Sequence, residues 1–189
     1  MFETANQALI IVDVQKAIDC YSQKQRNNPN AESVIASLLS RWRHRGLPVI
    51  HVRHSSKFES SPYHASSEFF GFKDLVSPAA GELVVTKAEN SAFIGTTLQQ
   101  ELVARGVTEI IVCGVLTNNS IDATVRVAAG LGYKVFVPQD ATAAFELDLL
   151  NGKQVVADDV HWMFLSNLHE EYCTVCTAGQ LLNSAIKGD

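Results

Sequence analysis

Short apolar runs alternate with longer amphipathic stretches along this chain, and the apolar runs predict strands. They are rich in β-branched residues and do not alternate with polar residues, which is typical of strands covered on both faces in a parallel sheet. Five such runs and a shorter sixth candidate lie at residues 8–14, 47–52, 82–86, 109–115, 133–137 and 173–176.

The amphipathic stretches between these runs predict helices. Residues 31–45 carry apolar side chains at helical spacing, and Gly46 follows as a typical helix end. Further helices are predicted at residues 95–105, 121–131, 154–168 and 178–187. The alternation of strands and helices predicts a three-layer α/β/α fold with a doubly wound, mainly parallel six-stranded sheet. Ligands of such folds bind beyond the carboxyl ends of the strands, so we expect a functional site there.

Composition and charge narrow the class of protein. The 189 residues suit one domain, which we expect to span residues 1–189. A net charge of −5 argues against a nucleic acid partner, since phosphate binding needs a basic surface. No apolar run reaches membrane-spanning length, and residues 1–5 lack the basic start of a signal peptide. We therefore expect a soluble, cytoplasmic protein that has no membrane partner.

One region breaks the alternation of strands and helices. Residues 53–81 contain serines, prolines and several aromatic residues without clear periodicity. A segment of this length inside a compact domain is often a lid or a binding loop. It leaves the second predicted strand at the sheet edge where the site is expected. A plain surface loop with a few aromatic residues packed beneath it is the other interpretation.

Three polar positions follow predicted strands. Asp13 follows the first, Lys87 the third, and the fourth runs into the turn 114–120, which opens a helix. The backbone N–H groups at a helix start favour a developing negative charge. If the strands are parallel, all three positions share one edge of the sheet, where a cation and desolvation tune the pKa of a carboxylate in opposite directions.

The residues at these positions resemble the isochorismatase-like cysteine hydrolase family over roughly residues 8–182. The resemblance rests on Asp13-Val14-Gln15, on Lys87 with Ser91-Ala92-Phe93, on Gly114-x-x-Thr117, Thr124-x-Arg126 and Gly132-Tyr133, and on Asp140-Ala141. It implies the isochorismatase-like hydrolase fold. The family includes nicotinamidases, carbamoyl amide hydrolases and other amidohydrolases as well as isochorismatases, so the resemblance implies a small-molecule substrate, no cofactor and a homo-oligomer, a dimer or larger.

The resemblance also implies a catalytic triad. Asp13 corresponds to the general base, Lys87 to the residue that orients and polarises it, and Ser120 stands where most of the family has a nucleophilic cysteine. The bond before Leu116 is expected in the cis form, with the backbone N–H groups of Leu116 and Ser120 directed at a tetrahedral oxyanion.

Ser120 is the departure from the family pattern. A serine hydroxyl is far less acidic than a thiol, whose pKa is about 8.5, and the motif holds no histidine to serve as its base. Three explanations are open. The serine is a laboratory replacement of cysteine, or it is natural with weaker or different chemistry, or it is a small spacer as in the isochorismatases that cleave a vinyl ether.

The resemblance gives candidates for a substrate pocket, and it weakens the case for a metal. The pocket candidates are Gln15, His54, Phe70, Phe93 and Asn119, with Tyr63 as a further aromatic residue; a position in the core is the other interpretation of Phe93. The metal site of nicotinamidases begins with Asp-x-His, but His51 occupies the place of the aspartate here, so no metal is expected.

Three functions remain in competition at this point. The first is hydrolysis of a small amide or carbamoyl C–N bond through Asp13, Lys87 and the residue at position 120. The second is a non-covalent vinyl ether hydrolase that uses Asp13 as its acid. The third is a catalytically silent family member that binds a metabolite or partner in the same pocket.

Overall fold

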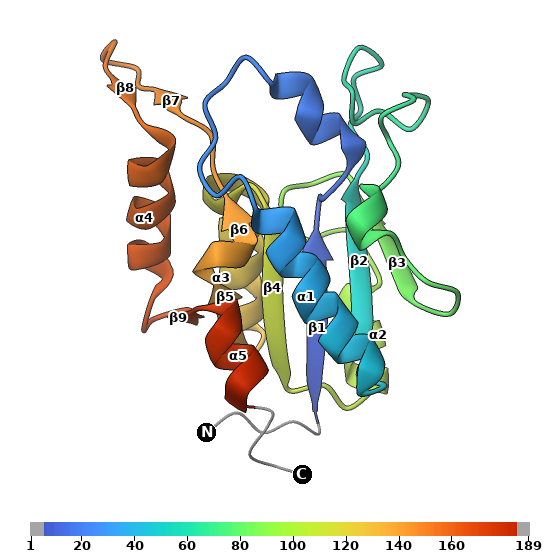
Figure 1. The fold of residues 1–189 in the computed structure, drawn as a ribbon. Coiled ribbons are helices and arrows are strands. Elements are labelled where there is room, and N and C mark those ends of the chain that lie inside the picture. The colour runs from blue at the N-terminus through green and yellow to red at the C-terminus, as the bar shows by residue number, and fades with distance from the viewer. Residues whose placement is uncertain (1–5, 185–189) are drawn as a thin grey trace.

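The centre of the molecule is a parallel sheet, shown in Figure 1 for a computed structural model that describes residues 6–184. Its main path has the strand order β3-β2-β1-β4-β5-β9, and every neighbouring pair is parallel. The strands are β1 (Gln7–Val12), β2 (Val49–His54), β3 (Leu83–Lys87), β4 (Glu109–Val115), β5 (Lys134–Pro138) and β9 (Thr174–Cys176). A two-residue strand, β6 (Thr142–Ala143), pairs with the end of β4. The six predicted apolar runs are these six strands.

The strand order creates a reversal point beside β1. The chain builds β1, β2 and β3 outward in one direction and then returns to place β4 on the other side of β1. Both β1 and β4 are buried along their whole length, as their unbroken apolar sequences predicted. The crevice at the carboxyl ends of the two strands flanking such a reversal is where doubly wound folds bind ligands.

Helices cover both faces of the sheet and complete the three layers (Figure 1). On one face, α1 (Ala31–His44) and α5 (Ala178–Ser184) bury Leu38, Trp42 and Leu181 against the sheet. On the other face lie α2 (Leu98–Ala104), α3 (Asp122–Gly130) and α4 (Ala157–Leu168). The predicted doubly wound α/β fold is therefore confirmed.

Several element boundaries differ from those that periodicity predicted. The predicted helix 154–168 begins only at Ala157, because Gln154–Val155 forms strand β8 of a hairpin with β7 (Leu147–Asp148). The helix expected from residue 121 is preceded by a π-helical turn, Thr117–Ile121. A 3₁₀ helix, Lys16–Tyr21, follows β1, and another, Asp74–Val76, interrupts the long segment before β3. Residues 185–187 of the predicted last helix lie outside the described residues.

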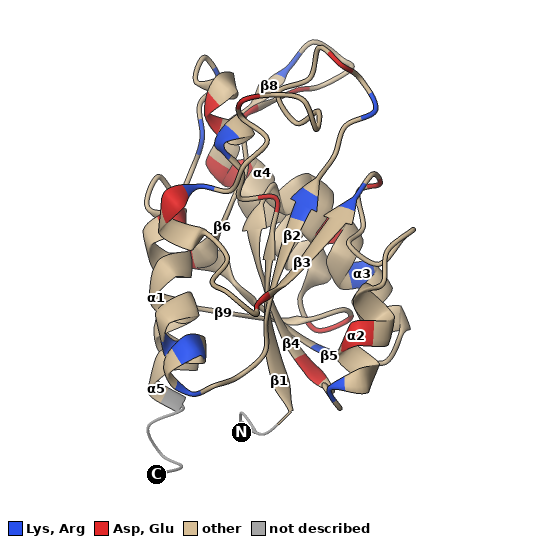
Figure 2. Ribbon diagram, turned by 90° about the vertical axis from the view of Figure 1, so that its right-hand side faces the viewer, with Lys and Arg blue, Asp and Glu red and all other residues tan. Residues whose placement is uncertain are grey.

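The charges lie mainly on helices and loops, whereas the central strands are largely free of them (Figure 2). Within residues 6–184, no helix combines the length and the apolar character needed to cross a bilayer.

Candidate active site

Asp13 stands at the reversal point, directly after β1. Its neighbour Val12 pairs with Gly114 of β4, so Asp13 and the turn after β4 leave the sheet side by side. A Cβ atom on Gly114 would lie 2.0 Å from the backbone oxygen of Val12, so only glycine permits this close approach. Asp13 itself has a left-handed backbone (φ +57°), a conformation that aspartate tolerates better than most residues. These backbone features bring the Asp13 side chain toward the turn that carries position 120.

Lys87 ends β3, and its side chain is buried with only 1% of the residue exposed. Its long side chain reaches past β2, which separates β3 from β1. The ammonium lies 2.8 Å from Asp13 Oδ2 and donates to Ser120 Oγ at 3.1 Å and to the backbone oxygen of Glu89 at 3.1 Å. All three of its protons thus have partners, which offsets the cost of burying a charge.

Ser120 completes the cluster from the π-helical turn. Its hydroxyl donates to Asp13 Oδ2 at 2.6 Å while accepting from Lys87. The turn follows a cis peptide bond between Val115 and Leu116, as the family resemblance implied. The structure therefore brings together Asp13, Lys87 and Ser120, three residues far apart in the sequence.

The two oxygens of Asp13 have different surroundings. Oδ2 contacts both Lys87 and Ser120, whereas Oδ1 is buried and has no hydrogen-bond partner among the described residues. Burial raises the pKa of Asp13 above its usual value of 3.8, even though the charge and hydrogen bond of Lys87 act in the opposite direction. Burial and the nearby Lys87 ammonium lower the pKa of His54. The site thus holds a carboxyl group whose protonated form is favoured by burial and whose Oδ1 has no hydrogen bond to the described residues.

A cavity of about 330 Å³ opens over this cluster at the carboxyl ends of the strands. Its lining comes from five segments of the chain, two of which carry Asp13 and Ser120; the other lining residues are Ile18, Tyr21, Lys24, His54, Ser61, Tyr63, Asn90, Val115, Leu116, Asn119 and Phe145. Residues 53–81 contribute His54, Ser61 and Tyr63, so this segment supplies part of a binding wall. The volume is at the small end of the range for ligand sites.

Three of the pocket candidates lie outside this lining. Gln15 is fully buried beside the wall, where its side chain bonds both backbone groups of His54 and the backbone oxygen of Phe70. The ring of Phe70 lies under the Arg53 guanidinium, and Phe93 packs in the core against Tyr133. His54, Asn119, Leu116 and Tyr63 do line the cavity.

Tyr21, Lys24 and Phe145 were missed as pocket residues. They come from the segment after β1 and the segment after β6, neither of which shows periodicity. Tyr21 ends a 3₁₀ helix, and Arg26 forms a bridge with Phe145. One feature of the sequence could have indicated them: residues 16–30 follow shortly after β1 and Asp13, and so begin at the edge of the sheet where the site was expected.

The remaining polar candidates have structural partners. His51 Nε2 lies 2.8 Å from Glu82 Oε2, and Arg126 forms an ion pair with Asp122 on α3. Among residues 6–184, no group of three or more histidine, cysteine, aspartate or glutamate side chains is placed to hold a metal ion. Cys173 and Cys176 are both buried with free thiols.

Comparisons with known proteins agree with the geometry. The isochorismatase domain model matches residues 7–178. An uncharacterised isochorismatase-family protein of Bacillus subtilis, YrdC, is 39% identical over 180 residues, which cover 95% of this chain and 96% of that protein. A streptothricin hydrolase of Streptomyces noursei is 34% identical over 144 residues, which cover 75% of this chain and 51% of that protein.

Solved structures extend the same agreement to three dimensions. The crystal structure of an isochorismatase-family protein from Chromobacterium violaceum superposes with a TM-score of 0.95 at 42% identity, covering 98% of this chain and 96% of that one. The match of the domain model, the near full-length relatives and the shared fold lead to one conclusion: this chain belongs to the isochorismatase family of hydrolases.

Proposed function

We propose that this protein hydrolyses the C–N bond of a small amide or carbamoyl compound, with Ser120 as nucleophile. Asp13 carries the proton in this mechanism, and Lys87 holds the two oxygens in place. The observation on which the proposal depends is the 2.6 Å hydrogen bond from Ser120 Oγ to Asp13 Oδ2 inside a cavity of small-molecule size. The relative named streptothricin hydrolase and the family resemblance to amidohydrolases support a hydrolytic reaction at such a site.

The steps follow from the contacts. Ser120 Oγ attacks the carbonyl carbon while its proton passes to Asp13, and Lys87 stays bonded to both residues. Asp13 then gives this proton to the leaving nitrogen as the C–N bond breaks, which leaves an ester on Ser120. Water attacks the ester, Asp13 accepts a proton from the water, and Ser120 recovers a proton as the acid departs.

Proton transfer from a serine hydroxyl to a carboxylate costs free energy, because the pKa of the hydroxyl is far higher. The burial of the site reduces this free energy cost. Each unit of pKa mismatch costs about 1.4 kcal/mol. The raised pKa of Asp13, which desolvation causes, narrows the gap to the hydroxyl. The Lys87 ammonium also donates to Ser120 Oγ, so it stabilises negative charge that develops on that oxygen.

A second function, non-covalent hydrolysis of a vinyl ether, is favoured by one observation. Asp13 Oδ1 has no partner among the described residues, and burial raises the pKa of this carboxyl. A protonated Asp13 would be a suitable acid for such a reaction, with Ser120 as a spacer.

Steady-state hydrolysis of a panel of small amides, carbamoyl compounds and vinyl ethers separates these functions. The covalent mechanism predicts that Ser120→Ala abolishes turnover, that Ser120→Cys raises it, and that mass spectrometry of a slow amide finds an acyl group on Ser120. Ser37→Ala, which removes an exposed hydroxyl of α1, is the control and should behave as the parent protein.

Other outcomes count against the covalent mechanism. Vinyl ether turnover that survives Ser120→Ala but is lost in Asp13→Asn favours the non-covalent reaction. Absence of turnover in the parent and in Ser120→Cys, together with tight binding of a panel compound, favours a silent binding protein.

A further inference from the structure

We infer that the ligand of the cavity is an anion with a flat apolar body, and that Lys24 recognises its negative charge. This inference names the substrate class of the site and so rests on the proposed function. It starts from the charges that line the cavity, where Asp13 is the only carboxylate and Lys24 the only ammonium among the described lining residues.

The carboxylate of Asp13 is already neutralised. Lys87, directly behind the wall, lies 2.8 Å from Asp13 Oδ2 and is itself almost fully buried. Lys24 is exposed and forms no ion pair with any carboxylate that the structure describes. The cavity lining therefore includes one ammonium that forms no ion pair with a described carboxylate, which favours an anionic ligand.

Two carboxylates near the cavity already have other partners. Glu146 follows the lining residue Phe145 and accepts a hydrogen bond from the backbone N–H of Gln25 at 3.2 Å. Glu89 precedes the lining residue Asn90 and forms an ion pair with Lys57 at 2.9 Å. Neither carboxylate lines the cavity.

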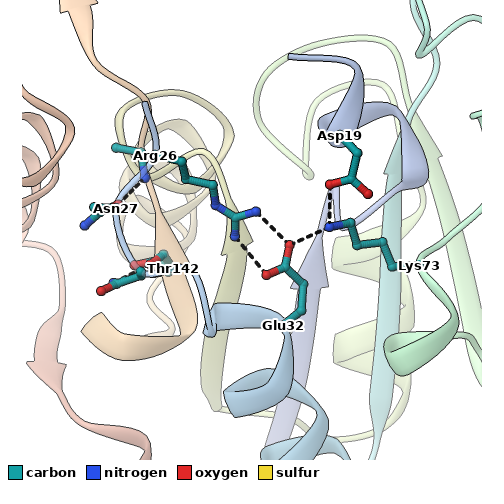
Figure 3. A network of polar contacts seen from close by, with 8 residues as sticks. Asp19, Arg26, Asn27, Glu32, Lys73 and Thr142 are labelled. Atoms are coloured by element: carbon teal, nitrogen blue, oxygen red, sulfur yellow. Dashed lines mark hydrogen bonds and ion pairs between the residues drawn. The ribbon is translucent and has the colours of Figure 1, made fainter. Parts of the chain in front are cut away.

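A polar network fixes the segment that carries Lys24 (Figure 3). Before Lys24, Asp19 pairs with Lys73 at 2.7 Å, and Lys73 also lies 3.0 Å from Glu32. After Lys24, Arg26 forms two hydrogen bonds to Glu32, of 2.8 and 3.0 Å. Lys24 itself donates its backbone N–H to the oxygen of Tyr21. The segment is thus held on both sides of Lys24, which fixes the backbone from which this side chain contributes to the cavity lining.

The neighbouring wall is aromatic. The ring of Tyr21 lies 6.2 Å from that of Phe145 and 6.5 Å from that of Tyr63, and Tyr63 also contacts the ring of His54 at 6.0 Å. Such rings favour a flat apolar or aromatic body. Aromatic faces also attract cations, but the ammonium of Lys24, which belongs to the same lining, opposes a positively charged ligand. The cavity thus has a reactive end at Ser120, an aromatic wall and a cationic residue in its lining.

The substrate class that fits these features is a small amide or carbamoyl derivative that also bears a carboxylate. Suitable probes are 3- and 4-carbamoylbenzoate, their uncharged methyl esters, and 4-(aminomethyl)benzamide as a cation of similar size. Release of ammonia gives kcat/KM for the carbamoyl group. Calorimetric binding to the Ser120→Ala protein gives a Kd that does not depend on turnover.

The variants Lys24→Met and Lys24→Glu test the role of the charge. We expect the parent protein to prefer a carbamoylbenzoate over its methyl ester, and Lys24→Met to weaken that preference by roughly three- to tenfold. Lys24→Glu should reverse the preference toward the cation, and added salt should weaken it in the parent. Lys153→Glu is the matched control, because Lys153 is exposed on the β7–β8 hairpin and lies outside the cavity lining.

The outcomes separate this inference from the proposed function. Turnover of all probes with equal efficiency, unchanged in the Lys24 variants, would overturn the inference and leave the hydrolase proposal intact. Absence of turnover together with tighter binding of the carboxylates that depends on Lys24 would overturn the hydrolase proposal alone. An equal loss of preference in Lys153→Glu would show that overall charge, rather than Lys24, sets it, and would also overturn the inference.

Discussion

Asp13 combines two features that rarely occur together in a buried carboxylate. One oxygen contacts an ammonium and a hydroxyl, and the other has no partner among the described residues. A carboxylate satisfied only for structure would have partners on both oxygens, since an unpaired buried acceptor costs about 1–3 kcal/mol. The unpartnered Oδ1 is therefore a cost to fold stability, as expected if Asp13 has the role in proton transfer that we propose.

The pH dependence of the reaction tests the role of Asp13. The covalent mechanism needs the ionised carboxylate, and burial raises its pKa above 3.8. We expect kcat/KM to fall as the pH decreases through this raised pKa, so the acid limb of the profile should lie above pH 3.8. The measurement is kcat/KM for the best amide of the panel between pH 4 and pH 8.

Substitutions of two aspartates test whether the acid limb of the pH profile reports the titration of Asp13. Asp13→Asn should lower kcat/KM by roughly a thousandfold or more, because it removes the proton acceptor. Asp148→Asn, on the exposed hairpin, should leave the profile unchanged. Persistence of the same acid limb in Asp13→Asn, at near-parental activity, would contradict the assignment of Asp13 as the base.

At the scale of elements, the turn that carries Ser120 is braced by a helix from the far end of the chain. Thr117 Oγ1, in the π-helical turn, lies 2.9 Å from His161 Nδ1 of α4, and both residues are almost fully buried. Burial lowers the pKa of His161, which favours the neutral ring. This contact gives His161 a packing role directly behind the turn that carries Ser120.

A double-mutant cycle on this bond tests the brace. Thr117→Val removes the hydroxyl at nearly constant volume, and His161→Phe removes the ring nitrogens. We expect each single variant to lose about 1–3 kcal/mol in unfolding free energy. The double variant should lose clearly less than the sum of the two single losses. Urea unfolding measures this coupling.

Both variants should also lower kcat with little change in KM. The turn carries Ser120, the proposed nucleophile, and forms only a smaller part of the cavity wall. Strictly additive losses of stability, or a change confined to KM, would show that the contact does not position Ser120.

The elements that the sequence predicted well are those whose local pattern matches their burial. The runs of β1 and β4 are apolar without interruption because both faces are covered, so the sheet and the positions of Asp13 and Lys87 at its edge could be inferred. For Phe93 both a pocket and a core position were open, because aromatic character alone does not distinguish a core from a cavity wall, and the structure places it in the core. Tyr21 and Lys24 lie in a segment without periodicity, and only its long-range contacts place them at the site.

At the scale of the whole molecule, Glu32 joins three parts of the chain, two of which contribute residues to the cavity lining (Figure 3). It lies in the first turn of α1 and contacts Arg26 from the segment after β1 and Lys73 from the segment before β3. Burial alone would raise its pKa, but the hydrogen bond and charge of Arg26, together with Lys73, outweigh this effect and lower the pKa below 4.5. The ionised form is therefore the one that stabilises the fold.

Replacement of Glu32 by glutamine tests this link through its pH dependence. A carboxylate whose folded pKa is lowered contributes stability that is fully present above its unfolded pKa and is lost as the pH falls through the folded value. We expect Glu32→Gln to lower the unfolding free energy at pH 7 by about 1–2 kcal/mol. The loss is this small because solvent screens part of the attraction between Glu32 and its partners Arg26 and Lys73. Urea unfolding at several pH values should show that the difference in unfolding free energy between the parent protein and Glu32→Gln is constant down to pH 5 and becomes smaller below pH 4.5.

The same variant connects stability to the cavity, because the network holds the segment with Tyr21 and Lys24. Its KM for a carboxylated probe should rise while kcat changes little, since Asp13, Lys87 and Ser120 lie outside the network. Glu101→Gln, which removes an exposed pair with Arg105 on α2, is the control and should change neither stability beyond about 0.5 kcal/mol nor KM. A stability loss for Glu32→Gln that persists unchanged at pH 4 would mean that packing, rather than the ionised carboxylate, joins these segments.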